Sequence, residues 1–168
     1  MRRERSGDAR NRHTSITRGG VHHRRVGWRT LILGVVALGA SGLVIELLLL
    51  EHWNATPQLI PLTTLALVLI ATGVVAVRAE RRTLGAFRAV MVWALVAGLL
   101  GIGLHLRDNV AFEREIAPDA SVVSTLWHAF RGATPLLAPG SLAQLGLIGL
   151  VFAYGHPGLS LPSDKETS

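Results

Sequence analysis

The chain has 168 residues, 49% of them hydrophobic, and a mean hydropathy of +0.41. Its 17 basic residues outnumber its 11 acidic ones, which gives a formal net charge of +6, and it contains no cysteine. The lack of thiols excludes disulfide exchange, thiolate metal sites and cysteine nucleophiles within this chain. The basic residues lie in the segments between apolar blocks, a distribution that argues against nucleic acid as a partner.

Residues 1–27 are arginine-rich and without periodicity, a composition that predicts a disordered basic cytoplasmic tail. The tail is interpreted as a determinant of topology, with contact to anionic lipid headgroups as the functional alternative. Arg24 and Arg25 before an apolar run resemble a twin-arginine signal. Gly27 stands where that signal requires an apolar side chain, so we expect the tail to be retained.

Four apolar blocks follow, each close to the length of about 20 residues that a helix needs to cross about 30 Å of hydrocarbon. A backbone in lipid must satisfy its own hydrogen bonds, so each block should be a helix. The predicted fold class is therefore all-α: a polytopic membrane protein with four transmembrane helices in a bundle, residues 28–157. The spans are expected at about 30–50, 59–77, 87–106 and 136–154.

The charges between the blocks predict the orientation. Nine arginines precede residue 30, four lie in residues 78–88, and the tail 158–168 adds Lys165. The opposite side carries only three: Arg107, Arg114 and Arg131. The positive-inside rule then places both termini in the cytoplasm, and the near absence of lysine is typical of a GC-rich bacterial genome. We expect a multi-pass protein of a bacterial inner membrane.

Small residues recur three or four positions apart in the first, third and fourth blocks, for example Gly98 and Gly101, and Gly146 and Gly149. This spacing predicts close backbone contact between helices. In the fourth block, Pro139-Gly140 interrupts the apolar run. We expect a broken start there, either as a re-entrant piece or as a span that begins at Ser141 with a helix N-terminus.

Residues 107–134 form the one large outer loop, and PDASVVSTLWHAFRG within it predicts a short amphipathic helix on the outer face. Asp119 is its expected N-cap and Gly132 its terminator. The apolar side chains share one face: Val122, Val123, Leu126, Trp127 and Phe130.

Polar groups from three predicted spans are expected near one depth on the outer side. Glu46 lies about 6 Å below the outer end of the first span, His105 at the end of the third, and Gln144 one turn into the fourth. Glu51 and His52 follow the first span at its outer mouth. These five residues are the predicted polar site.

Three interpretations of this site stay open. The first is a structural cluster in which Glu46 hydrogen-bonds to Gln144 and His105 and fixes the register of the helices. The second is a pocket for proton-coupled transport or for a small ligand, with Glu46 as the proton carrier. The third is a metal or haem site using His52, His105 and His128, although no HExxH spacing supports it. No metal, cofactor or enzymatic activity is predicted, since no Ser/His/Asp or paired-Asp arrangement lies at a useful depth.

LHLRDNVAFEREIAP followed by GATPLLAPGSLAQLGLIGLVFAYGHP resembles an uncharacterised family of small bacterial four-span membrane proteins. The likeness covers about residues 30–157, and its most distinctive positions are Thr134, Pro135, Pro139, Gly140, Gln144 and Pro157. The resemblance implies four spans and carries over no functional residue. The expected function is a structural or accessory membrane component, and the alternative is a small transporter or ligand-binding protein.

Overall fold

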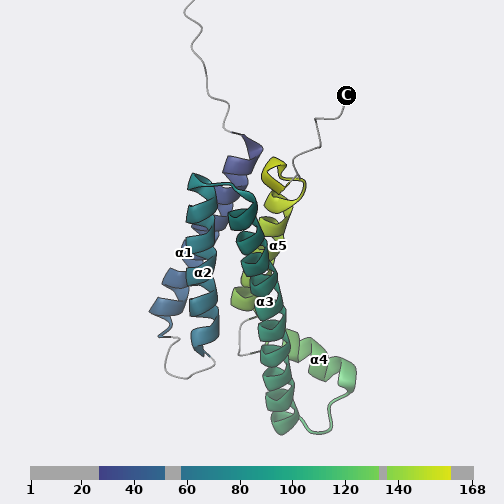
Figure 1. Ribbon diagram of the computed structural model, residues 1–168. Coiled ribbons are helices and arrows are strands. Elements are labelled where there is room, and N and C mark those ends of the chain that lie inside the picture. Colours follow the sequence, from purple (N-terminus) through teal and green to yellow (C-terminus); the bar gives the residue numbers. More distant parts are fainter. Residues whose placement is uncertain (1–26, 52–57, 133–135, 160–168) are drawn as a thin grey trace, which may run out of the picture.

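The computed structural model describes residues 27–51, 58–132 and 136–159 (Figure 1), and their regular structure is helical, without strands. The elements in chain order are α1 (Trp28–Leu49), α2 (Leu59–Val77), α3 (Arg81–Ile116), α4 (Val122–Phe130), α5 (Leu137–Ala153) and the 3-10 turn η2 (Pro157–Leu159). The predicted all-α class is confirmed for this part of the chain. The basic tail, His52, Thr134, Pro135 and the segment after residue 159 lie outside the described residues.

Three of the described helices, α1, α2 and α3, are long and apolar enough to cross a membrane. The bounds of α1 and α2 agree with the first two predicted spans to within two residues. α5 is apolar but has only 17 residues, which is about 26 Å of helix.

α3 is much longer than the third predicted span, because its 36 residues extend over about 54 Å. Its start at Arg81 is fixed by a capping box. The Thr83 hydroxyl accepts a hydrogen bond from the Glu80 backbone N–H at 3.0 Å, and the Glu80 side chain accepts one from the backbone of Thr83. The expected loop 78–88 is therefore reduced to residues 78–80. At its other end, α3 continues ten residues past the predicted span.

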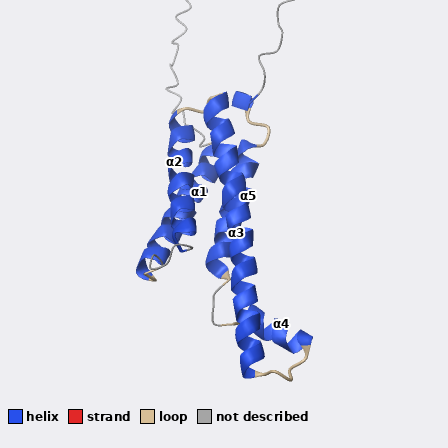
Figure 2. Ribbon diagram, turned by 60° about the horizontal axis from the view of Figure 1, so that its bottom comes forward, coloured by secondary structure: helices blue, strands red, loops and turns tan. Residues whose placement is uncertain are grey.

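The helices α1, α2, α3 and α5 pack side by side, and α4 lies against the far part of α3 (Figures 1 and 2). α3 packs most extensively on α5 and also on α2, while α1 packs on both α2 and α5. The start of α1 and the end of α5 meet, since the Arg29 Nη2 donates to the Gly155 carbonyl at 3.0 Å. α4 lies at the opposite end of the molecule (Figure 1).

The core lies between these four helices and uses helical spacing. α1 and α3 each bury one stripe of side chains three or four residues apart, and Phe87 of α3 meets Phe152 of α5 edge to face at 5.4 Å. The buried stripes are Val36, Ala40, Leu43 and Leu47 on α1, and Leu84, Phe87, Met91 and Ala94 on α3. Many of the other large apolar side chains of these helices are exposed, a pattern that suits a lipid environment.

α3 and α5 approach each other through glycine. A Cβ atom at Gly146 would lie 2.6 Å from the Leu95 backbone nitrogen and 2.7 Å from the Met91 carbonyl oxygen. Gly98 in turn faces the backbone of Ala143. The predicted close approach of small residues is confirmed for this helix pair, whereas Gly103 faces open space.

The predicted break at Pro139-Gly140 is wrong, because α5 runs without interruption from Leu137. The Gly140 N–H donates to the Leu136 carbonyl at 3.0 Å. Pro139 is the third residue of the helix, where a backbone N–H has no partner inside the helix, so the ring costs no hydrogen bond. Ser141 therefore does not begin a new helix.

Candidate functional site

The structure describes four of the five members of the predicted polar site: Glu46, Glu51, His105 and Gln144. Glu46 on α1 and Gln144 on α5 are exposed, and His105 on α3 is half-buried. Glu51 lies just beyond α1 with a positive φ of 49° and is also exposed. Among the residues described, no side-chain hydrogen bond or ion pair joins Glu46, His105 and Gln144.

Gln144 and His105 also lie at different depths along the helices. Gln144 follows Ala143, which contacts Gly98 of α3. His105 is seven residues beyond Gly98, a displacement of about 10 Å along the helix axis. The groove described below is lined by none of the three. A shared polar site at Glu46, His105 and Gln144 stays a prediction.

His105 marks a change of partner along α3. Seven residues before it, Gly98 faces α5, and four residues after it, Asn109 contacts α4. These spacings put all three residues on one helix face. His105 therefore lies between the start of α5 and the helix α4.

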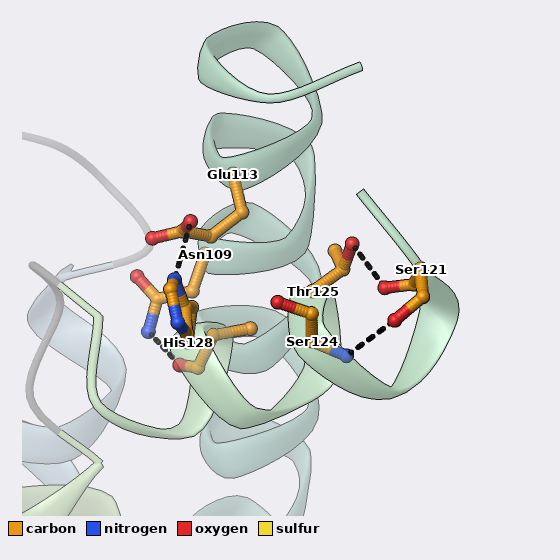
Figure 3. Close-up of polar contacts among 7 residues, drawn as sticks. Asn109, Glu113, Ser121, Ser124, Thr125 and His128 are labelled. Atoms are coloured by element: carbon orange, nitrogen blue, oxygen red, sulfur yellow. Dashed lines mark hydrogen bonds and ion pairs between the residues drawn. The ribbon is translucent and has the colours of Figure 1, made fainter. Parts of the chain in front are cut away.

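Asn109 joins α4 to the C-terminal part of α3 (Figure 3). Its side chain is only 2% exposed, and its Nδ2 donates to the Ala129 carbonyl at 2.9 Å. A Cβ atom at Gly132 would lie 2.7 Å from the Asn109 Cγ, so the chain after α4 passes directly over this amide. A buried amide with a partner fixes position more than a solvated one does, because breaking the contact leaves it unsatisfied.

Other polar contacts of α4 cap its N-terminus and connect its side to α3. The N-cap is Ser121 and not the expected Asp119: the Ser121 Oγ accepts from the Ser124 N–H at 3.3 Å, and the Thr125 hydroxyl donates to the Ser121 carbonyl at 3.1 Å (Figure 3). The His128 Nδ1 lies 3.6 Å from the Glu113 Oε2. The helix ends at Phe130, close to the expected terminator Gly132.

The apolar face of α4 is turned away from the rest of the structure. Thr125 and Ala129 are buried, whereas Val123 is 79% and Trp127 60% exposed. The Arg131 guanidinium lies 5.8 Å from the Trp127 ring centroid. An uncovered apolar face bordered by tryptophan and arginine is typical of a helix in the plane of a membrane surface.

The described residues contain no candidate metal site. No group of three or more His, Asp or Glu side chains in residues 27–51, 58–132 and 136–159 is placed to hold an ion. His128 of α4 lies beside Glu113 of α3, and His105 is also on α3. The third proposed ligand, His52, falls outside the described part.

At the opposite end, Arg29 holds the last turn of α5. Its Nη1 donates to the Phe152 carbonyl at 3.4 Å and its Nη2 to the Gly155 carbonyl at 3.0 Å. A cation here stabilises the negative end of the helix dipole. The His156 Nδ1 accepts a hydrogen bond from the Gly158 N–H at 3.1 Å, and burial together with the Arg29 charge lowers the pKa of His156.

Acidification should loosen this end. A lowered folded-state pKa means that His156 contributes stability above its ordinary pKa of 6.5, and that this contribution is lost as the pH falls below that value. Protonation also removes the lone pair that accepts from Gly158. We expect the thermal midpoint in detergent to fall more between about pH 7.5 and pH 5.5 for the native chain than for His156→Gln. Equal losses in both proteins would contradict this assignment.

Sequence reasoning did not identify Asn109, Glu113 or Arg29 as contact residues. The one available signal was spacing, because Asn109 continues the stripe of Gly98 and His105 at four residues. Comparison of the chain with protein-family models, with curated proteins and with solved structures gives no match.

Proposed function

We propose that the chain is a non-enzymatic accessory component of a bacterial inner membrane, and that it crosses this membrane four times. The packing of α5 against α3 supports the fourth crossing. Gly146 and Gly98 align α5 with residues 91–98 of α3, which is the middle of the apolar part of α3. A helix packed along that segment lies at the same depth as α3. The cyclic order of contacts α1–α2–α3–α5 supports the proposed four-helix bundle.

Charge supports the orientation. The start of α1, the turn between α2 and α3 and the end of α5 lie together, since the Gly158 backbone is near the Ala79 carbonyl. This end carries the exposed Arg78, Arg81 and Arg82. By the positive-inside rule it faces the cytoplasm, and α4 then lies on the periplasmic side.

Reporter fusions test this topology. We expect a fusion within residues 78–80 and one after residue 159 to report the cytoplasm, and one at residue 119 to report the periplasm. The matched control is an insertion without a reporter at each position, assayed for membrane insertion. A fusion at residue 119 on the same side as residue 80 would refute the four-span arrangement.

The observation that carries the accessory role is the exposure of Glu46. The residue lies three positions before the end of α1, and its side chain is exposed beside the buried stripe. A carboxylate on a lipid-facing surface is unfavourable, and such residues normally face protein or water. A polar group on an adjacent membrane protein would satisfy Glu46, so the lateral surface of α1 is the proposed contact.

Photocrosslinking tests the contact. We expect a photoreactive residue at position 46 to give an adduct with a discrete membrane protein, and one at Leu38, an exposed apolar position of α1, to give only lipid adducts. Glu46→Gln should reduce recovery of that partner in mild detergent, whereas Leu38→Ala should not. Lipid adducts alone at position 46 would refute the accessory contact. Saturable binding of a small ligand that Glu46→Gln abolishes would instead support the transport or ligand-binding function.

A further inference from the structure

A groove of about 520 Å³ opens between α1, α2 and the end of α5, at the end of the molecule that carries Arg29. Its volume falls within the range of about 300–1,000 Å³ typical of small-molecule sites. Most of the wall is apolar, and the buried ring of Phe152 belongs to it. The wall residues away from the mouth include Leu33, Gly34, Ala37, Leu69 and Gly73.

The groove exists because small residues face each other where α1 and α2 pass. A Cβ atom at Gly34 or at Gly73 would meet no heavy atom within 4 Å, so both positions border open space. The polar wall residue Thr72 donates its hydroxyl to the Val68 carbonyl at 2.7 Å and offers the groove no free donor. A hollow of this kind at the depth of the hydrocarbon is suited to an acyl chain.

The mouth of the groove is positive. Arg29 lines it and uses two of its N–H groups on the end of α5, while a guanidinium has five. α1 begins here with Gly27 as N-cap, without a side-chain capping bond and without an acidic residue in its first turn. Its positive dipole end therefore has no compensating negative group within the first turn. Exposed Trp28, with the Arg29 guanidinium 4.7 Å from its ring, is typical of the headgroup level.

We propose that this groove binds one anionic phospholipid, with an acyl chain between α1 and α2 and the phosphate at Arg29 and the start of α1. A free phosphate would use only the mouth and leave the apolar wall empty, and a neutral lipid would leave the positive mouth uncompensated. The leaflet that supplies the lipid, the cytoplasmic one, rests on the orientation proposed above. Binding itself does not depend on that orientation.

Native mass spectrometry of the full chain in detergent tests the site, with phosphatidylglycerol or phosphatidylethanolamine titrated as the probe. We expect a single tighter binding event for phosphatidylglycerol. Arg29→Gln should weaken it about tenfold, the effect of losing one hydrogen bond to a charged group. Gly73→Leu should abolish it by filling the groove without a clash.

Two control variants separate the site from general effects. Arg81→Gln removes the same charge at the same end but outside the groove, and Gly42→Leu adds the same side chain at an open position of α1 away from it. Both should bind like the native chain. Equal weakening by Arg29→Gln and Arg81→Gln, retained binding in Gly73→Leu, or equal affinity for the two lipids would overturn the proposal. None of these results would alter the reporter pattern that tests the topology.

Discussion

Gly146→Val lowers the free energy of unfolding in detergent by about 1–3 kcal/mol, the typical cost of overpacking a close contact. The added side chain would begin 2.6 Å from the Leu95 nitrogen, and backbone atoms cannot turn aside as a flexible side chain does. α5 must therefore shift away from α3, and both helices lose dispersion contacts along their length. Thermal and denaturant unfolding of the purified protein measure the loss.

Gly103→Val is the matched control. It adds the same branched side chain to α3, at a position where a Cβ atom meets nothing within 4 Å. The change in intrinsic helix propensity is the same in both variants, so the difference between them isolates the α3–α5 contact. Unfolding free energies that are indistinguishable for the two variants would show that the α3–α5 contact is not as close as described.

Asn109→Asp releases α4 from α3. The substitution keeps the shape of the side chain but replaces the donor Nδ2 with an oxygen that faces the Ala129 carbonyl. A buried acceptor then lacks its partner, which costs about 1–3 kcal/mol. The loss is expected to be local, because α4 packs on α3 alone among the described helices. Local opening of α4 should become about tenfold more frequent or more.

Thiol labelling measures this opening without background, since the chain has no cysteine. Thr125→Cys places a thiol of similar size at a buried position of α4, and Val123→Cys places one on the exposed face. We expect Asn109→Asp to accelerate labelling at position 125 and to leave position 123 unchanged. Asp108→Asn, an exposed neighbour, is the control substitution. Slow labelling at position 125 in the presence of Asn109→Asp would mean that the amide does not hold α4.

The positions of α1 and α2 could be predicted because one physical requirement, the thickness of the hydrocarbon, determines their length. Hydrocarbon thickness fixes the length of an apolar block, and α1 and α2 follow the predicted limits closely. α3 starts six residues before the predicted span because Glu80 and Thr83 form a capping box at its N-terminus. The acidic residue is the N-cap and the threonine is at N3, the reverse of the usual order. The length of an apolar block does not predict such a cap. The break predicted at Pro139 was wrong because a proline interrupts a helix only beyond its first turn, and the sequence did not show that α5 begins at Leu137.

The contacts between helices were harder to predict. The two faces of α4 follow from its sequence, but burial of Thr125 and Ala129 against α3 depends on tertiary placement. Asn109 lies in a charged segment where solvation is the ordinary expectation. Glu46, His105 and Gln144 were grouped by their distance from the span ends, which predicts depth but not the rotation of each helix, so their shared site stays a prediction.

The glycine contact between α3 and α5 has a consequence for biogenesis. In the four-span arrangement proposed above, α5 provides only about 26 Å of helix, less than a typical hydrocarbon core, so its insertion on its own is weaker than that of the longer helices. α3 is synthesised first and exposes glycine-bordered backbone that only a closely fitting neighbour fills. In that arrangement α5 inserts by docking on α3, which is already in place. A substitution at Gly98 that blocks this docking would then appear as misinsertion of α5.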